Sequence, residues 1–150
     1  NGLKGRPTPV DNSDVTPNRL RFELLEQEKV LVSYQCGAAL NDAEWDSYIE
    51  VIRSRAHLQR DMRSCTFTEG VHPTREQYER LRKVSQGFVT KVALIGPPPP
   101  SAFTAAVFKL TNRHVRMFDV HEREAAFEHL GLTLAEVRAV EATHARLRSA

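Results

Sequence analysis

The sequence predicts an α/β fold in which helices pack on a mixed β-sheet of four to five strands. Residues 91–96 place a run of four apolar residues, Val-Ala-Leu-Ile, before a glycine, which is typical of a strand buried on both faces. A predicted helix over 101–110 and a strand over 115–118 follow, and this order implies a right-handed crossover onto a parallel neighbour. Two β-prone runs, at 21–25 and 30–34, are separated by a polar loop and predict an antiparallel hairpin. We therefore expect the apolar run at the sheet centre and the first hairpin strand at an edge.

The composition suits a single domain with its own hydrophobic core. The chain has 150 residues, which is enough to bury a core without disulfides or metals. Its 21 Lys and Arg residues against 19 Asp and Glu give a net charge of +2, with both signs interspersed. A dedicated nucleic-acid binder carries a much stronger basic footprint. We therefore expect no nucleic acid among the partners.

The cysteines and the apolar runs indicate the compartment. Cys36 and Cys65 belong to no CxxC or Cys/His spacing, so buried thiols in a reducing compartment are favoured over a disulfide or a metal site. No apolar run approaches the roughly 18 residues that span a bilayer, and no basic segment followed by an apolar one precedes the domain. The sequence therefore predicts a cytoplasmic protein that neither inserts into a membrane nor is secreted.

The N-terminal segment is predicted to lie outside the folded domain. Residues 1–19 are rich in glycine and proline and contain scattered aliphatic side chains, too little apolar surface to offset the entropy of ordering. We expect this segment to be a flexible tail, or a linker to an upstream module, and to be dispensable for folding. Residues 20–150 are expected to form the domain, including the C-terminal helices.

The first helix and the third strand follow the hairpin. Asn41 and Glu44 form a capping-box pattern, which predicts a helix as far as about residue 57 with an aromatic and aliphatic stripe facing the sheet. A strand is predicted over residues 64–68, with Cys65 and Phe67 on one face.

The remaining helices are predicted from their caps. Thr74, with Gln77 three residues on, is expected to cap a second helix, and Ser101 a third. Beyond the last strand, an acidic helix is expected to end at Gly131, and Thr133 is expected to start another.

No residue pattern indicates catalysis or a cofactor. No two of the six histidines have the i, i+4 spacing by which one helix presents two metal ligands. Gly96 is followed by four prolines, which have no backbone N–H and cannot cradle a phosphate. No serine stands in a GxSxG motif, and neither cysteine has a neighbouring histidine. We therefore expect neither an enzyme nor a metal or cofactor site.

The turn between the third strand and the second helix is the best candidate for a binding surface. It joins the carboxyl end of a predicted parallel strand to a helix N-terminus, where open α/β sheets place their binding sites. The turn needs Gly70 for backbone freedom and Thr74 for capping. Val71, His72 and Arg75 then remain for recognition of an acidic or phosphorylated segment. A solvated turn that does no more than cap the helix is the alternative.

The pattern as a whole resembles the STAS domain, the family of the bacterial anti-sigma-factor antagonists, and in particular its diverged STAS-like members. The resemblance covers about residues 20–132 and depends on the order and local pattern of the elements. The matching features are the hairpin over 22–34, the helix start Asn-Asp-Ala-Glu-Trp at 41–45, the turn at 70–74, the strand at 92–95, the helix from Ser101, and the strand at 115–118 before an acidic helix.

The resemblance implies a mode of regulation. In the antagonists, a serine or threonine at the start of the helix after the third strand is phosphorylated by a partner kinase, and Thr74 matches it by position. The family's Asp-Ser-Ser/Thr-Gly pattern is replaced here by Glu-Gly-Val-His-Pro-Thr, so capping alone is favoured over a phosphosite at Thr74. A phosphate there would be tolerated by the helix N-terminus, with Arg75 adjacent.

The function that follows from the resemblance is a non-enzymatic protein–protein interaction module in bacterial signalling or assembly. The expected partner is another protein, such as a kinase or a regulatory protein, or a second copy of the chain. The partner-binding residues are expected to be Gly70, Val71, His72, Thr74 and Arg75.

A small-molecule or lipid-binding module is the alternative. The related STAS-like fold includes modules that hold lipids or other apolar ligands beneath the helices. The pocket would lie under the predicted third helix and be lined by Phe103, Val107 and Phe108.

Overall fold

The computed structural model describes residues 20–37, 39–55, 60–85, 91–98 and 114–150. The elements, in chain order, are β1 (Leu20–Leu25), β2 (Val30–Gln35), α1 (Asp42–Ser54), β3 (Arg63–Thr68), α2 (Arg75–Val84), β4 (Val92–Ile95), β5 (Val115–Phe118), the short 3-10 helix η3 (Val120–Glu122), α4 (Arg123–Leu130) and α5 (Leu134–Ser149). The predicted tail and the predicted helix over 101–110 lie outside the described residues.

The strands of the described ranges form one mixed five-stranded sheet. Their order is β1-β2-β3-β4-β5. β1 pairs with β2 in antiparallel register, as a hairpin must, and every other pair is parallel. The predicted mixed α/β sheet with an antiparallel strand at its edge is therefore confirmed.

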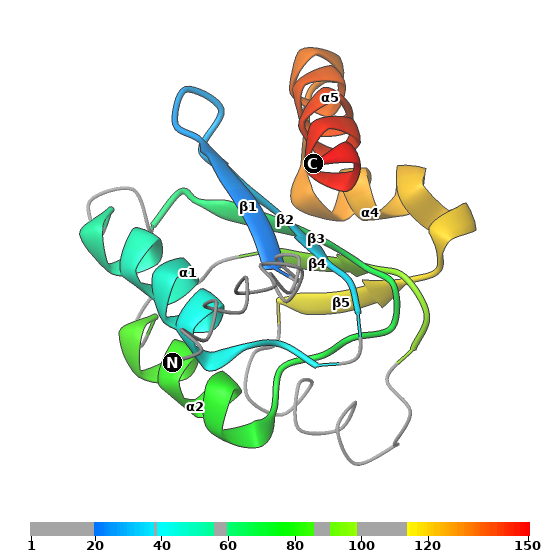
Figure 1. The fold of residues 1–150 in the computed structure, drawn as a ribbon. Coiled ribbons are helices and arrows are strands. Elements are labelled where there is room, and N and C mark those ends of the chain that lie inside the picture. Colours follow the sequence, from blue (N-terminus) through cyan, green and yellow to red (C-terminus); the bar gives the residue numbers. More distant parts are fainter. Residues whose placement is uncertain (1–19, 38, 56–59, 86–90, 99–113) are drawn as a thin grey trace, which may run out of the picture.

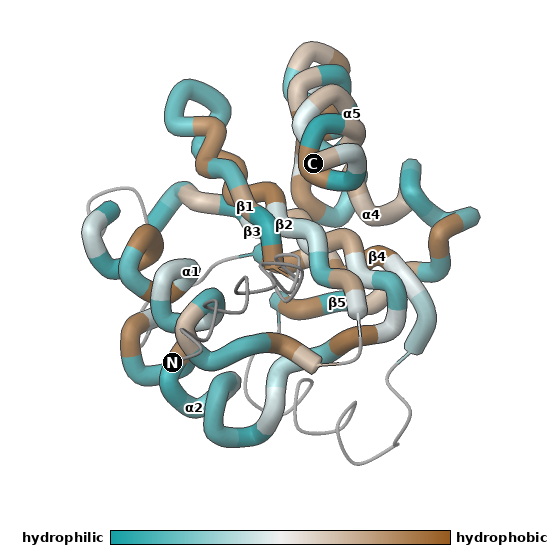
Figure 2. Tube along the Cα trace, viewed as in Figure 1, coloured by the Kyte–Doolittle hydropathy of each residue, from teal (hydrophilic) through white to brown (hydrophobic). Residues whose placement is uncertain are grey.

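Two layers of helices enclose the sheet. Helices α1 and α2 lie on one side, and α4 and α5 lie on the other (Figure 1). Hydrophobic positions gather in the strands between these layers, whereas the loop from β1 to β2 is hydrophilic (Figure 2). Alternate residues of β2 enter the two cores, with Val32 on the α4 and α5 side and Leu31 on the α1 and α2 side. The sheet is thus buried on both faces at β2.

The predicted place of the apolar run needs a correction. β4 is an interior strand, between β3 and β5, but the middle of the strand order is β3. Ala93 and Ile95 are buried against α4, whereas Val92 and Leu94 are half-buried. The expectation that this run is buried on both faces was therefore wrong, since one of its faces keeps partial exposure.

The most buried strands are the ones that carry polar residues. Ser33 of β2 and Thr66 of β3 are 0% and 3% exposed, and their hydroxyl oxygens lie 2.8 Å apart in a hydrogen bond. Tyr48 of α1 reaches this pair of strands, where its hydroxyl hydrogen-bonds Ser33 and Ser64, and burial raises its pKa. Because these polar groups satisfy one another, they can be buried at little cost. The serine and threonines of β3 therefore concealed its place in the middle of the sheet.

The caps predicted for the first two helices are in place. Thr74 and Gln77 form the reciprocal capping box of α2, with N···O distances of 3.2 and 3.0 Å. Asn41 caps α1 by accepting a bond from the backbone of Ala43 at 2.7 Å. Glu44 instead accepts a bond from the backbone N–H of Leu20 at 2.8 Å, which ties α1 to the start of β1. Helix α1 ends at Ser54, earlier than the predicted end near residue 57.

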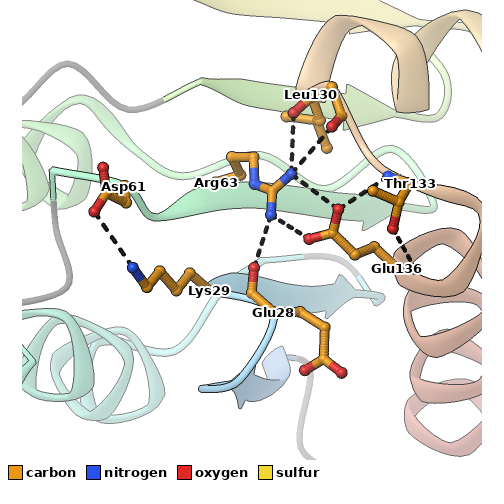
Figure 3. A network of polar contacts seen from close by, with 8 residues as sticks. Glu28, Lys29, Asp61, Arg63, Leu130, Thr133 and Glu136 are labelled. Carbon is orange, nitrogen blue, oxygen red and sulfur yellow. Dashed lines mark hydrogen bonds and ion pairs between the residues drawn. The ribbon is translucent and has the colours of Figure 1, made fainter.

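A polar network fixes the corner between α4 and α5 (Figure 3). Arg63, at the start of β3, forms an ion pair with Glu136 of α5 at 2.5 Å, and both side chains are about one-fifth exposed. The same guanidinium donates to the backbone oxygens of Glu28 at 2.7 Å and Gly131 at 3.3 Å. Glu136 also completes the capping box of α5 with Thr133. One arginine thus joins the hairpin loop, β3 and the α4 to α5 turn.

Candidate functional site

The carboxyl ends of the parallel strands meet at one edge of the sheet, because parallel strands share a direction. At this edge β3 turns into α2 and β5 turns into η3 and α4. We call residues 69–75 the turn surface. Open α/β sheets place their ligands in this position. The turn after β3 and the turn after β5 are therefore candidate binding sites.

The turn surface is shaped by the last residue of β3. The Thr68 hydroxyl donates to the backbone oxygen of Val71 at 2.6 Å and accepts from the backbone N–H of Gly70 at 3.1 Å. Gly70 has φ +111, a conformation that favours glycine, as predicted for this turn. Gly96 packs so closely that a Cβ there would lie 2.1 Å from the backbone oxygen of Thr68. The turn is therefore held by β3 and by the end of β4.

Val71 does not lie on the exposed surface, contrary to the sequence prediction. Its side chain is 6% exposed and packs in the core between the sheet and the α1 and α2 layer. An apolar side chain in this turn follows the hydrophobic core and not a partner. Val71 is therefore not available to contact another protein.

His72 is half-buried within the same turn. Burial lowers its pKa from the ordinary value, and a hydrogen bond with the backbone of Pro97 opposes that shift. The imidazole is thus mainly neutral at neutral pH, and it links the turn to the segment that follows β4.

Thr74 and Arg75 are the exposed members of the predicted set. The Thr74 hydroxyl is engaged in capping α2. Arg75 is the first residue of α2, and no ion pair involves its side chain within the described part of the chain. The other arginines of α2 are paired, Arg80 with Asp42 and Arg82 with Glu79.

A second group of polar side chains lies at the same sheet edge on the opposite face, and the sequence did not single it out. Tyr34, near the end of β2, donates its phenolic hydrogen to the carboxylate of Glu69. Burial, followed by the bond and the charge of Glu69, raises the pKa of Tyr34 to about 12. The tyrosine ring lies 5.8 Å from the ring of His144 in α5. Glu69 therefore joins the turn surface to the α4 and α5 side.

His144 is held between an aromatic ring and an arginine. Its ring stacks on Phe67 of β3, with centroids 3.8 Å apart and planes 10° from parallel. Arg123, the first residue of α4, donates from Nη2 to His144 Nδ1 at 2.7 Å, and its Nε lies 3.3 Å from the Glu141 carboxylate. Burial, and then the charges of Arg123 and Arg148, lower the pKa of His144 to about 4. The imidazole is therefore neutral at neutral pH.

These side chains border a cleft of about 500 Å³ between the two helices, which we call the α4–α5 cleft. Arg123 and His144 come from positions 21 residues apart, and the sequence offers no spacing that joins them. His144 and Arg148 are four residues apart on one helix, the one local signal that could have marked this face. The residues that line the cleft are Arg123, Glu141, His144, Ala145, Arg148 and Ser149.

The alternative pocket predicted from Phe103, Val107 and Phe108 lies outside the described residues. Among the residues that the structure does describe, no group of three or more His, Cys, Asp or Glu side chains could hold a metal ion. No helix within those ranges is both long and apolar enough to cross a membrane.

Comparisons with known proteins add no further assignment. No protein-family model, no curated protein and no solved structure matches this chain. The geometry of the described residues is therefore the basis for a function.

Proposed function

We propose that this chain is a non-enzymatic interaction module, similar to STAS domains, that docks a partner protein on the turn surface and the N-terminus of α2. The observation that supports this proposal is that Arg75 is exposed at the start of a helix and forms no ion pair among the described residues. Its place at the carboxyl ends of parallel strands is the position that α/β proteins use for recognition. The partner fits a pathway of bacterial signalling or assembly, as the resemblance implies.

The chemistry of the turn surface favours an acidic or phosphorylated partner segment. The N-terminus of a helix attracts negative charge, because its first N–H groups and the macrodipole both point outward there. Arg75 adds a guanidinium, which can form a bidentate pair of hydrogen bonds with a carboxylate or a phosphate. The other two arginines of α2 have their charge matched by nearby carboxylates, so Arg75 is the cation at the N-terminus of α2 that can accept an acidic group of a partner.

Thr74 has two roles at the proposed docking site. Its hydroxyl caps α2, which keeps the turn and Arg75 in place. Its exposure also leaves it accessible to a partner kinase, the use that the STAS resemblance implies. A phosphate on Thr74 would place negative charge beside Arg75 and compete with an acidic partner for it.

The test compares two charge reversals of equal size. Arg75→Glu places a carboxylate at the first turn of α2, where the helix tolerates it, and Arg138→Glu changes an exposed arginine of α5 on the other side of the sheet. We expect the wild type and Arg138→Glu, used as baits in host lysate, to retain a common protein that Arg75→Glu loses. Quantitative mass spectrometry of the retained proteins measures this.

Thermal melting of the baits serves as the control, and the two variants should melt within a few degrees of the wild type. If Arg75→Glu retains the same proteins in the same amounts, the turn surface is not the docking site. Val71→Asp is unsuitable for this test, because a charge at that buried position would unfold the domain.

A further inference from the structure

We propose that the α4–α5 cleft binds a small molecule through a phosphate group, which Arg123, His144 and Arg148 hold. This site is separate from the turn surface, because it lies on the α4 and α5 side of the sheet (Figure 1). Its volume of about 500 Å³ falls within the range of small-molecule sites. A cleft of this volume is large enough for a phosphorylated metabolite.

The donors that face the cleft come from two helices. Arg123 is the first residue of α4, and His144 and Arg148 stand one turn apart on α5. Arg123 Nε is buried and makes no hydrogen bond within the described ranges, although the Glu141 carboxylate lies 3.3 Å away. Three donor groups match the three outer oxygens of a phosphate better than the two oxygens of a carboxylate.

The orientation and the tautomer of His144 are fixed by its neighbours. Stacking on Phe67 fixes the plane of its ring, and a guanidinium can only donate, so Nδ1 must accept the bond from Arg123. The ring proton of neutral His144 is then on Nε2, which makes that atom a donor. The rigid ring adds little entropy cost to binding.

The charges around His144 explain how the site responds to pH. With His144 neutral, Arg123 and Arg148 contribute two positive charges and Glu141 one negative charge. Burial is the largest cause that keeps His144 neutral, and repulsion from Arg123 and Arg148 adds to it; an anion between the arginines offsets that repulsion, so binding raises the pKa of His144. By linkage, affinity rises as the pH falls toward that raised pKa. The titratable and charged groups around His144 are Tyr34, Arg123 and Arg148, which interact with it directly, and Glu141, Glu69 and Cys65, which interact with those neighbours.

Calorimetry and histidine NMR of the full chain test this site. Inorganic phosphate should bind and move the titration of the His144 ring to higher pH, whereas chloride at matched ionic strength should not. Phosphate gains a proton between neutral and acidic pH, whereas sulfate keeps its charge. The affinity for sulfate should therefore rise at lower pH through protonation of the protein alone. Arg148→Gln should weaken phosphate binding about tenfold, the loss expected for a charge-assisted hydrogen bond.

The matched control is Arg138→Gln, an exposed arginine of the same helix that does not line the cleft, and it should bind phosphate like the wild type. Equal effects of phosphate and chloride would overturn the proposal, as would unchanged phosphate binding by Arg148→Gln. Acetate that binds as tightly as phosphate would overturn the phosphate assignment. A phosphoserine peptide that binds more tightly than inorganic phosphate would overturn the small-molecule assignment and favour a phosphorylated partner.

Discussion

Replacing Arg63 by alanine should be among the most damaging single changes to a polar residue of this domain. The guanidinium forms an ion pair with Glu136 and donates to backbone oxygens of the hairpin loop and of the α4 to α5 turn (Figure 3). The substitution removes all of these bonds together. It leaves the Glu136 carboxylate, whose side chain is 17% exposed, without its cation.

The burial of the pair sets the size of the effect. Breaking a fully buried ion pair costs about 3 to 5 kcal/mol, and an exposed pair contributes about 0 to 1 kcal/mol. With both side chains about one-fifth exposed, we expect Arg63→Ala to lower the free energy of unfolding by about 2 to 4 kcal/mol. That loss is a large fraction of the 5 to 15 kcal/mol, roughly, that stabilises a typical domain.

Urea unfolding of four proteins measures the interaction. The wild type, Arg63→Ala, Glu136→Ala and the double variant form a cycle whose coupling energy should be about 1 to 3 kcal/mol. A matched cycle on Arg82 and Glu79, an exposed pair within α2, should give a coupling below about 0.5 kcal/mol. A loss below about 1 kcal/mol for Arg63→Ala would refute the reasoning, because the network would then not secure the α4 to α5 corner.

The same pair predicts a dependence on pH. The bond from Arg63 is the largest cause that lowers the pKa of Glu136 in the folded state. A lowered folded pKa gives stability that is present above the unfolded value, about 4.3, and is lost as the pH falls through the folded value. The difference in unfolding free energy between the wild type and Arg63→Ala should therefore shrink below about pH 4. A constant difference down to the acid transition would contradict the ion pair.

Three further predictions concern the core and the sheet edge. Gly96→Ala should destabilise the domain by more than about 2 kcal/mol in urea unfolding, because the new Cβ would lie 2.1 Å from a backbone oxygen of β3; a near-neutral variant would contradict this close approach. Within β4, Ile95→Ala should cost about 2 to 5 kcal/mol and the half-buried Leu94→Ala about 1 to 2; the reverse order would mean that the buried face of β4 is misassigned. In native protein a thiol reagent should modify Cys36 before Cys65, since burial raises the pKa of Cys65 to about 12; fast labelling of Cys65 would refute its burial.

The sequence by itself determined the local elements and their caps. The hairpin of β1 and β2, the capping box of Thr74 and Gln77, the left-handed end of α4 at Gly131 and the cap of α5 at Thr133 all depend on residues close in the chain. Patterns of this kind reflect hydrogen bonds and backbone preferences within a few residues, so they can be predicted without the fold. The mixed sheet followed, because a hairpin and parallel crossovers fix strand directions.

Burial was decided by the tertiary structure. Polar Ser33 and Thr66 lie in the most buried strands because they bond to each other across β2 and β3. Val71, in a turn that looked exposed, is buried because the α1 and α2 layer closes over it. In each case the partner that decides burial lies far away in the sequence, so hydropathy along the chain could not indicate it.

The α4–α5 cleft likewise exists only in the folded chain. Arg123, His144 and Phe67 come from α4, α5 and β3, and none of them belongs to a sequence motif. Helix packing across the sheet brings the arginine onto the imidazole and the imidazole onto the ring, and the resulting burial and charge keep His144 neutral. A site made by long-range packing leaves no periodic signal, since each of its residues satisfies an ordinary helix or strand pattern where it stands.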